Sequence, residues 1–157
     1  MSRRHGFTLL ELMLAVMIGL LLMGIAVPSV VGLMREQALK KTFEEFDAFV
    51  HKAQAMAVSE RGTFVMVWEK EGIQLLPLDT LEAEQRGPVE QFAFSEDCVW
   101  TLTRPAALVK KPVWEWPFWR SGACEPVIVN YESPAGTWSA EYNGLTGRGK
   151  ITEMDVK

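Results

Sequence analysis

One carboxylate in this sequence stands where an acid is costly. Glu11 lies inside an apolar run that begins at Phe7, and the sixteen residues from Leu12 to Val27 carry no charge. In lipid, a carboxylate near the end of a helix costs on the order of a few kcal/mol, so it is interpreted as functional and needs a partner that neutralises it. The chemistry that this pattern indicates is therefore charge pairing, with Glu11 as the anion.

The element that must position Glu11 is a long helix. The apolar run extends over residues 7–34, interrupted only at Pro28-Ser29. At ~1.5 Å rise per residue a helix of this length measures ~42 Å, which is enough to cross a bilayer. Arg3 and Arg4 precede the run and would hold its start in the cytoplasm.

Two ordinary interpretations explain only part of this segment. A secretory signal peptide also begins with basic residues, but its apolar core has about 7–15 residues and ends in a small-residue cleavage site. The run here is longer and is not followed by an Ala-x-Ala site. A plain membrane anchor accounts for the length and the orientation, but it gives no reason for Glu11 or for the Gly6-Phe7 junction.

A third interpretation is a resemblance. Gly6-Phe7-Thr8-Leu9-Leu10-Glu11 resembles the processing motif of the type IV prepilins and the type II secretion pseudopilins. The resemblance implies that a prepilin peptidase removes the leader, residues 1–6, by cutting between Gly6 and Phe7, and that the new N-terminal Phe7 is N-methylated. It also implies that Glu11 serves filament assembly and that Pro28 kinks the helix.

Charge pairing agrees with this resemblance. Cleavage after Gly6 would create an α-amino group at the start of the helix, and Glu11 of a neighbouring subunit could pair with that cation. At ~4 Å and an effective dielectric constant of ~20 the pair is worth roughly 4 kcal/mol, which is comparable with the cost of the buried carboxylate. The pair would also set the axial offset between stacked subunits.

The rest of the chain, residues 35–157, is long enough for one head domain of ordinary size. The formal charge of the 157-residue chain is −4, and it becomes more negative when the two arginines of the leader are lost. Nucleic-acid binding needs clustered lysines and arginines, so no nucleic-acid partner is expected.

The head begins with a continuation of the helix. No Gly or Pro occurs between Arg35 and Glu60, and apolar or small residues recur there every three or four positions. These are Val31, Met34, Ala38, Thr42, Phe46, Phe49, Ala53 and Met56. The stripe predicts an amphipathic helix that covers a domain and ends at about residue 61, with Gly62 as its C-terminal cap.

Beyond Gly62 the pattern changes to a period of two residues with turns between the runs. Candidate strands lie at 63–68, 73–76, 89–94, 99–103, 107–110, 127–131, 137–142 and 149–155, and an acidic loop lies at 77–88. Short connections predict antiparallel pairing. The predicted fold class is α+β: a long N-terminal helix packed on a C-terminal antiparallel β-sheet head, the type IV pilin-like fold.

Segments in the second half of the chain restrict the resemblance to particular subfamilies. Ala57–Gly62, Phe118–Gly122 and Gly144–Arg148 are similar to segments of the H-type (GspH) minor pseudopilins and the FimT-like minor pilins. This implies a non-enzymatic subunit at or near the tip (the tip complex) of the periplasmic pseudopilus of a type II secretion system. The alternative is a FimT-like minor pilin of a type IV pilus, in pilus assembly or DNA uptake.

The same resemblance implies the location and the partners. The chain would be a single-pass protein of the inner membrane with its head in the periplasm. Its partners would be the prepilin peptidase, other minor and major pseudopilins, the inner-membrane assembly platform and membrane lipid. No small-molecule substrate is expected.

Trp114-Glu115-Trp116-Pro117-Phe118-Trp119 departs from the family by its density of aromatic residues. It is either core packing or an exposed anchor for another subunit, in which case Trp114, Trp116 and Trp119 would lie in a partner interface. Cys98 and Cys124 raise a similar choice. In an oxidising compartment they could form a disulfide worth ~3 kcal/mol, or they are two buried small hydrophobic residues.

The sequence gives little support for a nucleotide-binding, catalytic or calcium-binding site. Gly144–Lys150 fits the first seven positions of a phosphate-binding loop, but Ile151 stands where the magnesium-binding Ser or Thr belongs. His51 has no evident triad partners, and Glu96-Asp97 lacks the spacing of a calcium loop. No cofactor, metal or catalytic residue is therefore expected.

Overall fold

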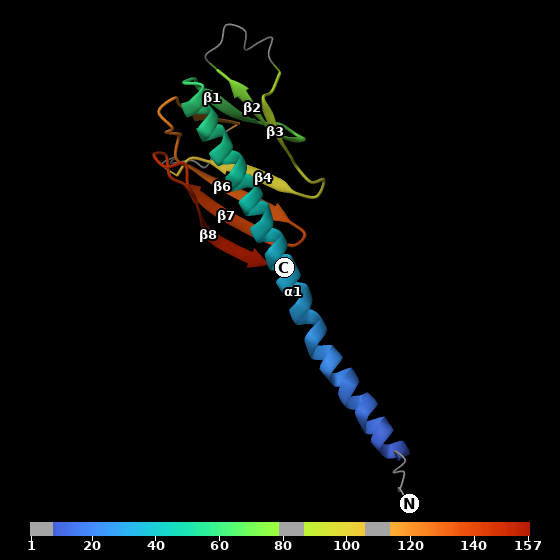
Figure 1. Ribbon diagram of the computed structural model, residues 1–157. Coiled ribbons are helices and arrows are strands. Elements are labelled where there is room, and N and C mark those ends of the chain that lie inside the picture. Colours follow the sequence, from blue (N-terminus) through green and yellow to red (C-terminus); the bar gives the residue numbers. More distant parts are fainter. Residues whose placement is uncertain (1–7, 79–86, 106–113) are drawn as a thin grey trace, which may run out of the picture.

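The computed structural model describes residues 8–78, 87–105 and 114–157, without the side chains of residues 24–29. One long helix, α1 (Leu9–Ser59), crosses a head that consists of two antiparallel sheets (Figure 1). The C-terminal half of α1 packs on the head, and the N-terminal half projects from it. The predicted α+β class is confirmed.

Eight strands follow α1. They are β1 (Phe64–Trp68), β2 (Gly72–Pro77), β3 (Glu90–Ala93), β4 (Val99–Thr103), β5 (Glu115–Phe118), β6 (Val127–Ser133), β7 (Gly136–Tyr142) and β8 (Gly149–Val156). The first sheet has the order β3-β2-β1-β5 and the second the order β4-β6-β7-β8. Every pairing between neighbouring strands is antiparallel.

The chain passes from one sheet to the other between β3 and β4, and aromatic side chains pack together at this crossing. The rings of Phe94 and Trp100 stack with their centroids 5.5 Å apart, and Phe92 meets Trp100 edge-on at the same distance. Such pairs add about 0.5–1.5 kcal/mol each beyond their buried area. The two sheets therefore share one aromatic core rather than forming separate layers.

The buried stripe of α1 starts later than the sequence predicts. Leu39 is 1% exposed, whereas the predicted members Val31 and Met34 are 42% and 65% exposed, and Ala38 is exposed as well. The head first covers the helix at Leu39. Of the predicted members beyond Ala38, Phe46, Phe49 and Ala53 are buried, and Thr42 and Met56 are half-buried. Val50 and Ala57, which the prediction did not include, are buried as well.

α1 ends at Ser59, about two residues before the predicted end at residue 61. Glu60 is the C-cap, and its N–H bonds to the oxygen of Met56 at 2.9 Å. The left-handed residue that follows is Arg61, with φ of 52°, and not Gly62. A left-handed conformation is uncommon for a residue with a side chain, so this position is strained although a glycine is next to it.

The predicted strands agree with the structure except in the aromatic segment. The candidate at 107–110 and residues 79–86 of the predicted acidic loop lie outside the described residues. The segment around Pro117 was not predicted as a strand, yet it forms β5, in which Pro117 lies opposite Val65 of β1. β5 is an edge strand, and proline is tolerated there because no neighbour needs its N–H on the outer side.

Candidate assembly interface

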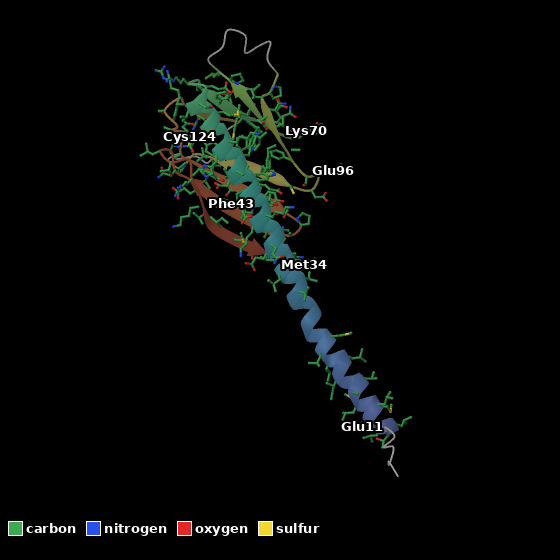
Figure 2. The ribbon with its side chains drawn as sticks, viewed as in Figure 1. Glu11, Met34, Phe43, Lys70, Glu96 and Cys124 are labelled. Atoms are coloured by element: carbon green, nitrogen blue, oxygen red, sulfur yellow. The ribbon has the colours of Figure 1, made fainter. Side chains whose placement is uncertain are left out.

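The first turn of α1 is built around Thr8 and Glu11. Thr8 is the N-cap, and its hydroxyl accepts a hydrogen bond from the N–H of Glu11 at 3.3 Å. The N–H of Leu12 bonds to the main-chain oxygen of Thr8 at 3.2 Å. Thr and Glu at this spacing form the start of a capping box, in which an acid in the first turn favours the helix. Figure 2 shows Glu11 at the far end of α1 from the head.

This capping gives Glu11 a local role that the sequence analysis missed. A threonine three residues before a glutamate is the sequence signature of a capping box, so Thr8 could have indicated this role. An acid in the first turn gains about 0.3–1 kcal/mol from the helix dipole at a water-exposed site. In lipid the same carboxylate costs on the order of a few kcal/mol. Capping therefore explains why an acid is tolerated at position 11, but it is too weak to compensate for the transfer into lipid.

The N-terminal half of α1 presents an exposed apolar surface. Leu9 is 82% exposed, Met17 62% and Met23 68%, and the surface resumes at Val30 and continues to Met34. Apolar surface of this extent marks contact with lipid or with other proteins.

In the described part of the chain, no helix combines the length and the hydropathy required of a membrane span.

The predicted processing site is not described. Gly6 and Phe7, the residues expected to be cut and methylated, lie outside the described residues. The backbone of α1 is one helix from Leu9 to Ser59, and the side chain of Pro28 is outside the described set. Cleavage, methylation and the kink at Pro28 therefore stay predictions.

The aromatic segment divides into buried and exposed residues. Trp116 is fully buried, and its ring lies 4.8 Å from that of Phe118 and 5.2 Å from that of Tyr142. It belongs to the core, so its predicted place in a partner interface is wrong. Trp114 and Trp119 are 64% and 41% exposed, and their contact with a partner stays a prediction.

The two cysteines are free thiols. Cys98 precedes β4, and its sulfur lies 3.1 Å from the hydroxyl of Tyr131. Cys124 precedes β6 and donates a weak hydrogen bond to the oxygen of Asn143 at 3.8 Å. The sulfurs thus have different partners near opposite ends of β6, and the predicted disulfide is not formed. Cys124 is 3% exposed, in agreement with the alternative interpretation as a small hydrophobic residue.

Burial also sets the chemistry of these side chains. It raises the pKa of Cys124 to about 11, so this thiol is protonated at neutral pH and is a poor nucleophile. Burial is also the main cause that raises the pKa of Tyr142, with the nearby Asp47 carboxylate adding to it. Neither group is tuned toward catalysis at neutral pH.

His51 and the Gly144–Lys150 segment have structural roles. His51 Nε2 lies 3.3 Å from Asp47 Oδ2, and Asp47 Oδ1 accepts a hydrogen bond from the N–H of Gly149 at 3.3 Å. The bond between Gly149 and Asp47 joins α1 to the start of β8. Residues 144–148 form the turn between β7 and β8, and Gly149 and Lys150 are the first residues of β8. Among the described residues, no group of three or more potential ligands could hold a metal ion.

Comparisons with known proteins agree with this arrangement. Residues 1–27 match the family model described as the prokaryotic N-terminal methylation motif. The fold is similar to that of the type IV minor pilin FimU of Pseudomonas aeruginosa, with a TM-score of 0.55 and 15% identity over 76% of this chain and 94% of FimU. A second crystal form of FimU gives a TM-score of 0.52, with 16% identity over 74% of this chain and 97% of FimU.

The fold is also similar to that of the minor pseudopilin EpsH from the type 2 secretion system of Vibrio cholerae. This match has a TM-score of 0.53 and 13% identity over 72% of this chain and 94% of EpsH. No curated protein sequence matches the chain. The chain therefore combines an N-terminal methylation motif with a type IV pilin-like fold.

Proposed function

We propose that this type IV pilin-like chain is a minor pseudopilin, a non-enzymatic subunit of the tip complex of the periplasmic pseudopilus of a type II secretion system. The observation that carries the proposal is the arrangement of α1. A methylation motif leads into an exposed apolar helix that has one acid, Glu11, in its first turn. A helix of this kind suits both storage in a membrane and packing into a filament.

The proposed assembly proceeds from the chemistry of Glu11. Prepilin peptidase cuts between Gly6 and Phe7, and Phe7 is then N-methylated. The mature chain is held in the inner membrane by residues 7–34, with its head in the periplasm. Glu11 pairs with the α-amino group of an adjacent pseudopilin at the assembly platform, which neutralises the carboxylate and fixes the axial register of the subunits.

A minor pilin of a type IV pilus is the second candidate, and the similarity to FimU favours it as much as the similarity to EpsH favours the first. The charge distribution of β8 supports the secretion system over DNA capture. Lys150 lies opposite Glu141 across the β7–β8 pair, and the same strand carries Glu153 and Asp155. β8 thus carries one lysine and two acids, whereas binding to phosphates requires clustered cations.

Replacement of Glu11 tests the proposal. The full-length chain would be produced in its host as wild type, Glu11→Gln and Glu11→Ala, and recovery would be compared in the membrane fraction and in complexes with sister pseudopilins. We expect equal amounts in the membrane and at least about a tenfold loss from the complexes, because the pair is worth several times the ~1.4 kcal/mol that corresponds to a factor of ten. Leu14→Ala is the control for a change of the same apolar surface.

Two outcomes would contradict the proposal. One is recovery of Glu11→Gln with sister subunits at the wild-type level. The other is a native polypeptide that mass spectrometry finds to begin before Phe7 in cells with an active prepilin peptidase. Complexes with pilins of a type IV pilus instead of pseudopilins would favour the second candidate.

A further inference from the structure

The end of the head that lies farthest from Glu11 carries an open groove. Its walls are Arg61 and Thr63, which follow the end of α1, and Trp119, Arg120 and Ser121, which follow β5. We call these five residues the distal groove. α1 has 51 residues and is ~77 Å long at ~1.5 Å per residue, so the groove and Glu11 are at opposite ends of the molecule (Figure 1).

The groove is formed by an ordered turn. The N–H of Trp119 bonds to the oxygen of Ala123 at 2.9 Å, and the N–H of Gly122 bonds to the oxygen of Trp119 at 2.8 Å. Gln54 of α1 also donates a hydrogen bond to the oxygen of Gly122 at 2.5 Å. The turn is therefore held against α1, and a partner would meet a preformed surface and lose less conformational entropy on binding.

The charge of the groove is opposite to that of the chain as a whole. It contains two arginines and no acid, in a chain with a formal charge of −4. Several other cations of the head are paired: Lys40, Lys52 and Arg104, for example, lie 2.6–2.8 Å from carboxylates. In the part of the chain that the structure describes, neither Arg61 nor Arg120 makes an ion pair.

An apolar surface accompanies the two guanidinium groups. Trp119 is 41% exposed in the groove, and Val58, which is 50% exposed, lies on the α1 side of the same turn. Arginine and tryptophan are the residue types that dominate binding energy at protein interfaces, and arginine binds carboxylates with two parallel hydrogen bonds. The groove therefore combines recognition of an acid with burial of an apolar side chain.

Resting on the proposed function, we infer that the distal groove binds an acidic segment on the head of another pilin-like subunit, with a carboxylate between Arg61 and Arg120 and an apolar side chain against Trp119. In a tip complex built on parallel N-terminal helices, this end of the head faces any subunit that lies farther from the membrane. Nucleic acid fits less well, because Trp119 and Val58 interrupt the basic surface and the rest of the chain is acidic.

The conformation of Arg61 provides a variant that separates binding from folding. Arg61 has φ of 52°, which a glycine adopts without strain, so Arg61→Gly should fold at least as stably as wild type. If Arg61 contacts the partner, the same variant loses binding. Trp119→Ala and Arg120→Ala test the rest of the groove. The matched controls are Leu145→Ala and Arg148→Ala, which change an exposed apolar residue and an exposed arginine in the turn before β8, outside the groove.

The experiment uses the full-length chain in its host. A photo-crosslinking amino acid would replace Ser121 in the groove and, as a control, Lys70 at another edge of the head. We expect crosslinks from position 121, and not from position 70, to an acidic segment of a protein that carries the same N-terminal methylation motif. Recovery of that protein with the full-length chain should fall about tenfold for Arg61→Gly, Arg120→Ala or Trp119→Ala and stay unchanged for the controls.

Three results would overturn the inference. The first is recovery of the partner at the wild-type level by Arg61→Gly and Trp119→Ala. The second is a crosslink from position 121 only to proteins without the methylation motif. The third is retention of a short fluorescent duplex DNA that depends on Arg61 and Arg120. If the groove variants recover the partner as wild type does, but Glu11→Gln still prevents incorporation, the groove inference is wrong and the proposed function is unaffected.

Discussion

Trp116 Nε1 donates a 2.8 Å hydrogen bond to the main-chain oxygen of Glu125. The bond joins β5 of the first sheet to the segment that leads into β6 of the second. The indole is fully buried, and without this bond its N–H would be buried without an acceptor. The most aromatic segment of the sequence therefore contributes to the cohesion of the head through Trp116.

The first prediction concerns this residue. Trp116→Ala should lower the free energy of unfolding by about 3–5 kcal/mol, because it removes a large buried ring and leaves a cavity. Trp116→Phe keeps part of the packing but loses the donor to Glu125, so its loss should be smaller. Urea unfolding of the full-length chain in detergent, followed by circular dichroism, measures both values.

Trp114→Ala is the matched control, because Trp114 is 64% exposed and lies two residues away. Its unfolding free energy should differ from wild type by no more than about 0.5 kcal/mol. If Trp116→Ala unfolds at the same urea concentration as wild type but loses a partner subunit, Trp116 belongs to an interface and its assignment to the core is wrong.

A second prediction follows from the two glycines on either side of the distal groove. An added Cβ at Gly62 would meet its nearest neighbouring atom, Cε2 of Phe64, at an ordinary contact distance of 3.8 Å. At Gly122, φ is +83° and the added Cβ would lie 3.1 Å from Val58 Cγ2. Gly62→Ala should therefore be neutral or slightly stabilising, whereas Gly122→Ala should cost about 1–2 kcal/mol.

Thermal unfolding of the two variants tests this difference. The sequence alone suggests the reverse order for Gly62, since glycine directly after a helix is usually the left-handed residue that ends it. A large loss of stability in Gly62→Ala would mean that Gly62, and not Arg61, adopts the left-handed conformation. The interpretation of Arg61→Gly in the groove experiment would then no longer hold.

The sequence predicted the elements that depend on periodicity. The helix to Ser59 and the strands from Val99, Val127 and Gly136 are long or strongly patterned, and each has glycine, proline or a turn near its ends. Glu11 could be chosen as a candidate because one charge in an apolar run is costly in any fold. These inferences needed no tertiary information.

The errors arise where tertiary packing decides. Whether Ala38 or Leu39 faces the core depends on where the second sheet first meets α1, and Cβ atoms of neighbouring helix residues differ by ~100° in direction. β5 was not predicted because it contains Pro117, and a proline normally argues against a strand unless the strand lies at the edge of a sheet. Cys98 and Cys124 are each near strands, but only the sheet order reveals that their sulfurs have different partners at separate ends of β6.

The last prediction concerns stability at alkaline pH. Burial raises the pKa of the Cys124 thiol from its usual 9.0 to about 11. The unfolded chain loses this proton near pH 9, and the folded chain retains it until about pH 11. Between these values the folded state binds more protons than the unfolded state, so the stability from this thiol is fully present below pH 9 and decreases as the pH rises through 11.

Urea unfolding of the full-length chain at about pH 8, 9 and 10 measures this decrease. The decrease amounts to about 1.4 kcal/mol for each unit by which the pKa of the folded chain exceeds that of the unfolded chain. Burial also raises the pKa values of Tyr131 and Tyr142, so wild type should lose stability at alkaline pH for more than one reason.

Cys124→Ala and Cys124→Ser both remove the titrating thiol, and serine keeps a donor for the oxygen of Asn143. Both variants should show a shallower decrease between pH 9 and 10 than wild type, whatever their stability at pH 8. An unchanged slope in both would mean that Cys124 is accessible to water in the folded chain, and the burial of this thiol in the head would have to be revised.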